Sequence, residues 1–192
     1  MRITDETRLE RVKQATIRII VEKGYYGTTI SNIANSAGVS TGYLYRHYKN
    51  KADLVRSLFV ENKRNFHKTL FDFLDKSNTI EEFLHRSCQY IRQTVTENPE
   101  IIKFYSLLTH DYNFKFPDII KEEVILIGNK IRQKGLQTGE ISPETEVEEI
   151  LLSFFGLQAK LLDMAEKGVI SPKYFEEMAK QRIISMCLKL WR

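Results

Sequence analysis

Residues 28–55, which read TTISNIANSAGVSTGYLYRHYKNKADLV, constrain the fold of this chain more than any other segment. Small and apolar residues recur there at spacings of three and four, which predicts two short helices joined by a tight turn. Ile33 and Ala34 lie on the inner face of the first helix, and Gly38 ends it. Ser40 can cap the second helix, whose inner face carries Leu44.

Helical periodicity continues through almost the whole sequence, and no segment alternates like a strand. One helix precedes the segment and stops at Gly24. The helices expected after it span residues 50–75, 80–97, 101–110, 118–138, 144–167 and 172–191. The sequence therefore predicts an all-α protein of about nine helices, with three helices in residues 1–50 and the others in residues 51–192.

Charge is distributed unevenly along the 192 residues, whose formal net charge is +4. Residues 1–64 contain 12 Lys and Arg against 6 Asp and Glu, whereas residues 65–192 contain 17 against 19. A basic N-terminal third joined to a slightly acidic remainder favours a polyanion-binding head and a body with another task.

Several classes of protein have little support in the sequence. No apolar run reaches the length of a membrane span, and the polar N-terminus does not resemble a signal peptide. Two lone cysteines, Cys88 and Cys187, form neither a disulfide framework nor a zinc motif. We expect a cytoplasmic protein with no metal and no cofactor. No catalytic constellation is visible, so we expect no enzyme.

The short helix after Gly38 has the features of a helix that is placed against DNA. Its small N-terminal residues would allow close approach to base edges, and the side chains that follow can bind phosphate oxygens. The predicted DNA contacts are Thr29, Ser31, Ser40, Thr41, Gly42, Tyr43, Tyr45, Arg46, His47, Lys49 and Lys51. Partly buried packing of the Tyr43 and Tyr45 rings is the alternative at those two positions.

This segment resembles the DNA-binding domain of the TetR family of bacterial transcriptional regulators. The matching residues are Gly27-Thr28-Thr29, Ile33-Ala34, Ala37-Gly38-Val39-Ser40, Leu44-Tyr45, His47-Tyr48 and Lys49-Asn50-Lys51 with Leu54. The resemblance covers about residues 6–64. It implies a homodimer, a palindromic operator in double-stranded DNA, and a ligand-binding and dimerisation domain in residues 51–192. Positions like Thr41 and Gly42 often touch bases in this family, and Gly42 can offer only its backbone.

The body is rich in aromatic residues, which predicts a well-filled core and an apolar cavity for a lipophilic or aromatic effector. The candidate ligand-binding residues are Tyr90, Phe104, Tyr105, His110, Phe154 and Gln158. The last two helices are apolar over a wide arc that includes Leu151, Phe154, Leu161, Met178, Ile183, Met186, Cys187 and Leu190. Such an arc predicts a homodimer interface.

The sequence thus favours a ligand-responsive repressor that binds a palindromic operator as a homodimer. A DNA-binding protein of the same fold without a small-molecule effector, with a structural or division-control role, is the alternative.

Overall fold

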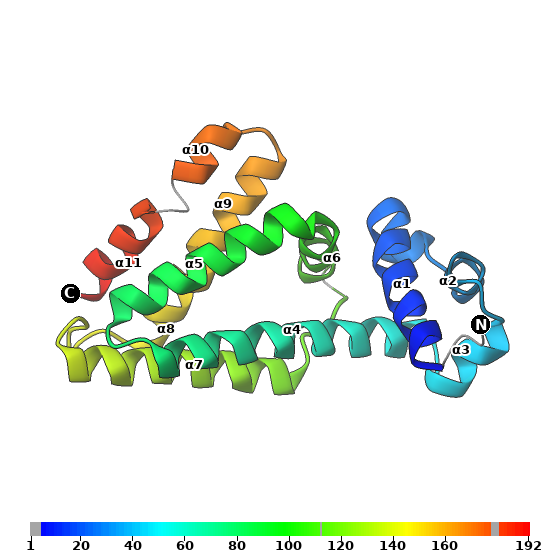
Figure 1. Cartoon of the computed structure of the whole chain (residues 1–192), viewed down its shortest axis with the longest axis horizontal. Coiled ribbons are helices and arrows are strands. Elements are labelled where there is room, and N and C mark those ends of the chain that lie inside the picture. Colours follow the sequence, from blue (N-terminus) through cyan, green and yellow to red (C-terminus); the bar gives the residue numbers. More distant parts are fainter. Residues whose placement is uncertain (1–4, 112, 178–180) are drawn as a thin grey trace. The chain divides into compact units, whose positions relative to one another are not determined.

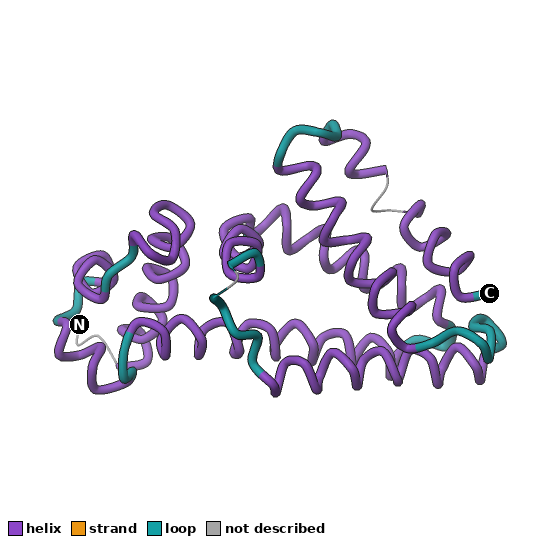
Figure 2. The backbone as a smooth tube through the Cα atoms, turned by 180° about the vertical axis from the view of Figure 1, so that it is seen from behind, coloured by secondary structure: helices purple, strands orange, loops and turns teal. Residues whose placement is uncertain are grey.

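The computed structural model describes residues 5–111, 113–177 and 181–192. These residues form helices and connecting loops, and none of them lies in a strand (Figure 2). The N-terminal helices are α1 (Asp5–Gly27), α2 (Ile30–Ala37), α3 (Thr41–His47) and α4 (Lys51–Lys76) (Figure 1). The remaining helices are α5 (Ile80–Glu97), α6 (Pro99–Thr109), α7 (Asp118–Thr138), α8 (Val147–Leu151), the π-helical turn η1 (Leu152–Gly156), α9 (Leu157–Glu166), α10 (Pro172–Glu177) and α11 (Ile183–Trp191).

The chain folds into two compact units. The first contains residues 1–64 and 95–117, and the second contains residues 65–94 and 118–192. The functional division that we expect at residue 50 stays a prediction, because packing alone does not assign function. None of the described helices is both long and apolar enough to cross a membrane.

The predicted start and stop residues define the short helices of the first unit. Gly24 has a φ of 70°, which interrupts the regular geometry of α1. Thr29 caps α2 by accepting a hydrogen bond from the backbone of Asn32, and Gly38 ends α2 in the left-handed conformation. Ser40 caps α3 by accepting a hydrogen bond from the backbone of Tyr43.

Buried apolar side chains from α1 to α4 then fix the packing of these helices. The cluster consists of Val12, Ala15, Ile19, Ile33, Ala34, Ala37, Tyr43, Leu44 and Leu54. Because α3 has only seven residues, it depends on this packing rather than on its own helical propensity. The expected inner faces of α2 and α3 are therefore confirmed at Ile33, Ala34 and Leu44.

Helix α6 and the loop after it also belong to the first unit. The Phe59 ring of α4 meets three aromatic rings from this segment, at centroid distances of 5.5 Å to Tyr105, 4.9 Å to Phe114 and 5.6 Å to Phe116. This inclusion of residues 95–117 in the N-terminal unit was not visible in the sequence, because it depends on contacts between distant segments.

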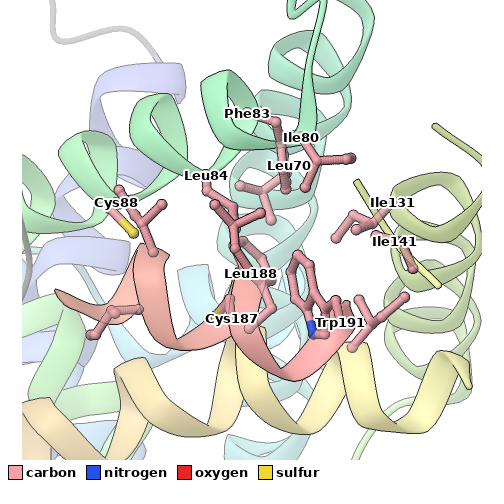
Figure 3. Close-up of a cluster of buried hydrophobic side chains, with 14 of the residues drawn as sticks. Leu70, Ile80, Phe83, Leu84, Cys88, Ile131, Ile141, Cys187, Leu188 and Trp191 are labelled. Atoms are coloured by element: carbon pink, nitrogen blue, oxygen red, sulfur yellow. The ribbon is translucent and has the colours of Figure 1, made fainter. Parts of the chain in front are cut away.

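The second unit is built around a core to which α4, α5, α7, η1 and α11 contribute. Side chains of α11 point toward those of α5 in this core, with Cys187, Leu188 and Trp191 opposite Leu84 and Cys88 (Figure 3). Trp191 is fully buried, and its Nε1 donates a 2.8 Å hydrogen bond to Ser153 Oγ of η1. The C-terminal helix is thus fixed by both apolar packing and a satisfied polar group.

Two glycines on α7 allow other segments to approach this helix closely. A Cβ atom on Gly128 would lie 2.8 Å from a side-chain atom of Val147, and one on Gly135 would lie 2.3 Å from side-chain atoms of Ile141. Both glycines are buried and seven residues apart, so they lie on one face of the helix. Close contact of α7 with α8 and with the loop before it requires this lack of side chains.

Two expected helices differ from the structure. The helix expected over residues 144–167 begins at Val147 and includes the π-helical turn η1. The helix expected over residues 172–191 is present as α10, which ends at Glu177, and as α11, which begins at Ile183. The predicted interface residue Met178 lies outside the described residues.

We predict that Gly135→Ala lowers the free energy of unfolding by about 1–3 kcal/mol, because the added methyl group overlaps Ile141. Helical propensity alone would favour alanine by about 1 kcal/mol. Gly156→Ala is the matched control, since its Cβ would meet only Leu152 Cδ1 at 3.5 Å. Urea unfolding followed by Trp191 fluorescence measures both. Equal stability of the two variants would contradict the close approach.

Candidate nucleic-acid interface

The first unit presents most of the predicted DNA contacts on its surface. The exposed ones are Thr29, Ser31, Ser40, Thr41, Gly42, Tyr45, Arg46, His47 and Lys49. They come from the start of α2, from α3 and from the loop before α4. The fold therefore leaves these polar side chains accessible while the opposite face of each helix is buried.

The N-terminal end of α3, which we call the α3 tip, consists of Ser40, Thr41 and Gly42. A Cβ atom on Gly42 would meet only Ser40 Oγ, at 3.9 Å, so the space beside the backbone is open. Such a bare tip allows close approach to a base edge, as the sequence predicts. Thr41 has the exposed side chain of the tip that is not engaged in capping.

Tyr45 is the most exposed aromatic side chain of α3, with 59% of its surface accessible. It stands on the outer face of the helix, whereas Leu44 beside it is fully buried. Its hydroxyl group can donate to a phosphate oxygen, and exposure of such a ring agrees with a contact role rather than core packing.

Tyr43 is placed differently from our expectation of a surface contact. Only 4% of its surface is accessible, and its hydroxyl donates a 2.8 Å hydrogen bond to Asp5 Oδ1 of α1. Burial raises the pKa of the hydroxyl, and the Asp5 bond adds to this effect, while the charges of Arg8 and Arg46 oppose it. Because its hydroxyl is used inside the unit, Tyr43 packs inside the unit and is more deeply buried than the alternative of partly buried ring packing anticipates.

Lys51 also differs from the expected phosphate contact. Its Nζ donates to the carbonyl oxygens of Tyr25 and Thr28, at 2.7 and 2.9 Å, and lies 4.2 Å from the centre of the Tyr25 ring. Burial lowers the pKa of this ammonium. The Lys51 side chain therefore ties the start of α4 to the end of α1 and the start of α2.

His47 and Arg46 complete the surface of α3. The His47 ring lies 4.8 Å from the Tyr43 ring, and its Nε2 lies 3.8 Å from Asp5 Oδ2. The Arg46 guanidinium lies 5.2 Å from the centre of the same Tyr43 ring. The buried Tyr43 ring thus contacts both His47 and Arg46, which are exposed at the surface.

The six candidate ligand-binding residues belong to different units. Phe104, Tyr105 and His110 lie in the first unit, and Tyr90, Phe154 and Gln158 lie in the second. Phe104 and Phe154 are fully buried. His110 is exposed, and its ring Nδ1 lies 2.8 Å from the carbonyl oxygen of Ser106.

Gln158 lies beside a small apolar cavity of the second unit, with a volume of about 10 Å³. Its side-chain amide donates to the Phe154 carbonyl oxygen at 2.6 Å, and the Cys88 thiol lies 3.9 Å from its Oε1. Arg92 and Phe175 also line the cavity. This volume is about that of one water molecule, so a larger ligand could enter only if the surrounding helices moved.

Sequence reasoning missed Lys63, whose ammonium packs against aromatic rings of the first unit. Its Nζ lies 4.4 Å from the centre of the Tyr105 ring and 6.0 Å from that of Phe59. Burial lowers the pKa of Lys63 from 10.5 to about 8. The sequence does not predict this contact, because α4 and α6 are far apart in the chain. Each of the aromatic residues is evident in the sequence, but their proximity to Lys63 is not.

Comparison with known proteins agrees with this geometry. The model of the N-terminal domain of bacterial regulatory proteins of the tetR family matches residues 14–58. The fatty acid metabolism regulator protein of Bacillus subtilis (strain 168) is 27% identical over 163 residues, which cover 76% of this chain and 77% of that protein.

Two solved structures share the fold. The fatty acid degradation regulator FadR from Bacillus halodurans has a TM-score of 0.81 at 20% identity and covers 94% of this chain and 97% of its own. FadR from Bacillus subtilis in complex with stearoyl-CoA has a TM-score of 0.83 at 20% identity and covers 96% and 100%.

The exposed α3, braced by α2 and capped at a bare tip, together with these relatives, defines a helix-turn-helix transcriptional regulator rather than an enzyme. The helix-turn-helix of the chain, within residues 14–58, belongs to the TetR family of bacterial regulatory proteins.

We predict that the contribution of the Lys63 ammonium to the stability of the protein rises between pH 8 and 10.5. Its folded pKa, about 8, lies below the unfolded value of 10.5, so the unfolded chain binds more protons in this window. The burial penalty is complete below pH 8 and is relieved as the pH rises. Because the side chain is half-buried, the gain is about 2 kcal/mol at most.

Lys63→Met is expected to remove this rise, and the exposed Lys68→Met on the same helix is the control. Urea unfolding followed by circular dichroism at several pH values measures the difference between each variant and the wild type. A parallel pH dependence of the wild type and Lys63→Met would contradict the assignment.

Proposed function

We propose that this regulator is a ligand-responsive repressor that binds a palindromic operator as a homodimer and leaves it when a lipophilic effector binds. The observation that carries the proposal is the α3 tip, which is bare and accessible at the end of a helix whose inner face is locked in a core. A helix held in this way can enter the major groove without losing its orientation.

The polar side chains around the tip support the same proposal. Tyr45, His47 and Lys49 are exposed beyond it, and Thr29 and Ser31 are exposed at the start of α2. Side chains of these types bind phosphate oxygens and fix the register of a helix on DNA, while Thr41 and the Gly42 backbone are left to read bases.

Homodimer formation is supported by apolar side chains that the second unit leaves exposed. Met186 and Leu190, four residues apart on α11, have 41% and 62% of their surfaces accessible, and Leu152 of η1 has 75%. The hydrogen bond between Trp191 and Ser153 joins the two elements that carry Leu190 and Leu152. Exposed apolar side chains on two joined elements suit a two-fold interface.

The interface is narrower than the sequence predicts. Phe154, Leu161, Ile183 and Cys187, which we expected at the dimer surface, are buried within the chain's own core. Their burial corrects the predicted wide arc, because α11 already covers this side of the second unit. The exposed residues Leu152, Met186 and Leu190 remain for a partner subunit.

We propose a long-chain acyl thioester as the first effector to test. The Bacillus subtilis relative is a regulator of fatty acid metabolism, and the solved FadR of that organism contains stearoyl-CoA. An acyl chain agrees with the lipophilic effector expected from the aromatic body. The effector must bind one arrangement of the helices better than another in order to shift the protein off DNA.

A regulator without a small-molecule effector is the second candidate, and one observation favours it. The cavity beside Gln158 has a volume of only about 10 Å³, so the packing around it is nearly complete. In this case operator binding would be constitutive.

We predict that the protein retards a DNA fragment from the region upstream of its own gene, and that Tyr45→Phe weakens this binding about tenfold through loss of one hydrogen bond to phosphate. Tyr174→Phe removes a hydroxyl from an exposed tyrosine of the second unit and is the control. A gel shift with titrated protein measures the three affinities. Unchanged binding by Tyr45→Phe would remove this residue from the interface.

The same assay tests the effector. Stearoyl-CoA is expected to release the DNA fragment, whereas free coenzyme A is expected to leave it bound. The reason is that free coenzyme A lacks the acyl chain, which supplies the apolar surface buried on binding. Release by neither compound, with operator binding intact, would favour the regulator without an effector.

We predict that Leu190→Asp shifts the protein from dimer to monomer, because it places a charge in an apolar interface. Operator affinity should fall with it, since each subunit then binds a half-site alone. Leu136→Asp on α7, where 36% of the residue is accessible, is the control. Sedimentation velocity measures the assembly state. A dimeric Leu190→Asp protein would place the interface elsewhere.

A further inference from the structure

A cavity of about 360 Å³ lies in the first unit between α1 and the helix-turn-helix. Its walls are Arg8 and Arg11 of α1, the turn at residues 38–40, and Tyr43 and Arg46 of α3. Three arginines therefore line one cavity, and none of the described residues in its lining is acidic. Of the three, only Arg46 was among the DNA contacts predicted from the sequence.

The positive charge of this cavity is left uncompensated within the described part of the chain. None of the ion pairs between described residues involves Arg8, Arg11 or Arg46. The Nε of Arg11 is buried and has no hydrogen-bond partner among the described residues. Guanidinium groups carry donors only and stay protonated, so the cavity offers donors and positive charge at any ordinary pH.

The local structure holds two of the three arginines, Arg11 and Arg46, in place. The Arg46 guanidinium rests over the Tyr43 ring, which the bond from its hydroxyl to Asp5 immobilises. One Nη atom of Arg11 lies 3.4 Å from the position that a Cβ of Gly38 would take, so the guanidinium packs directly on the turn. The donors are thus organised before any ligand arrives.

We propose that this cavity binds one backbone phosphate of duplex DNA, with Arg8 and Arg11 extending the interface from α3 onto α1. The inference deepens the proposed function, on which it rests. Ser40 and Arg46, already expected at the interface, form part of the same wall, so a strand that passes the α3 tip can reach the cavity. Arginine pairs recognise phosphate with bidentate hydrogen bonds, and the volume leaves room for the adjoining sugar.

The test measures the salt dependence of DNA binding by fluorescence anisotropy, with the upstream fragment and with a random duplex. Loss of one phosphate contact per subunit in the double variant Arg8→Gln and Arg11→Gln should reduce the slope of log K against log salt by about 2 for the dimer, about 1 for each subunit. Affinity should fall about tenfold for both duplexes, since a phosphate contact carries no sequence information.

The matched control is Lys23→Gln, which removes one positive charge from an exposed residue of the same helix outside the cavity. Its slope should equal that of the wild type. The double variant Arg8→Lys and Arg11→Lys should keep the slope of the wild type, because the positive charge remains. It should lose part of the affinity, because lysine cannot form the bidentate hydrogen bonds of arginine. If circular dichroism shows that the double variant does not fold, the single variant Arg8→Gln is used instead, because Arg8 is exposed.

Binding of inorganic phosphate distinguishes a free phosphate ion from a backbone phosphate of DNA as the ligand of the cavity. A thermal shift by phosphate that depends on Arg8 and Arg11, without any change in the DNA slope, would overturn the proposal in favour of a free anion. An unchanged slope and no phosphate effect would also overturn it and leave the proposed function intact. If the wild type bound neither duplex, the proposed function would fail together with the inference.

Discussion

The helix-turn-helix depends on the ammonium group of Lys51, which joins three helices at one point. By donating to the carbonyl oxygens of Tyr25 and Thr28, it fixes the start of α4 against the end of α1 and the entry to α2. Helix α3 lies between these anchored segments in the chain and has only seven residues. The orientation of α3 is therefore set by the segments on either side of it and by the packing of the buried Leu44. The central contact is that of the Lys51 ammonium with the carbonyl end of α1.

The two units meet different physical demands. The first uses short capped helices to present polar side chains outward, and its charged groups are held by aromatic rings, as at Lys51 and Arg46. The second buries large apolar side chains around Trp191 and leaves apolar residues such as Leu190 on its surface. Polar exposure in one unit and apolar exposure in the other suit the two kinds of partner that we propose, a polyanion and a protein surface.

Much of this architecture follows from the sequence, because helix caps and apolar periodicity are local signals. Gly38 and Ser40 act where the pattern places them, and α5 and α7 have the expected bounds. The errors concern contacts between distant segments. Nothing near Tyr43 or Lys51 in the sequence indicates that Asp5 and the carbonyl of Tyr25 would engage them. Arg8 and Arg11 likewise read as ordinary solvated charges until the turn at Gly38 is folded against α1.

The open space beside Gly42 has a consequence for the divergence of such regulators. The position has no neighbour closer than Ser40 Oγ and lies in a helix of ordinary handedness, so larger residues fit there without disturbing the core. In the interface that we propose, a single substitution at this position would change the sequence preference for DNA at little cost in stability. After gene duplication, two copies of this protein could acquire separate target genes before the rest of their sequences had changed.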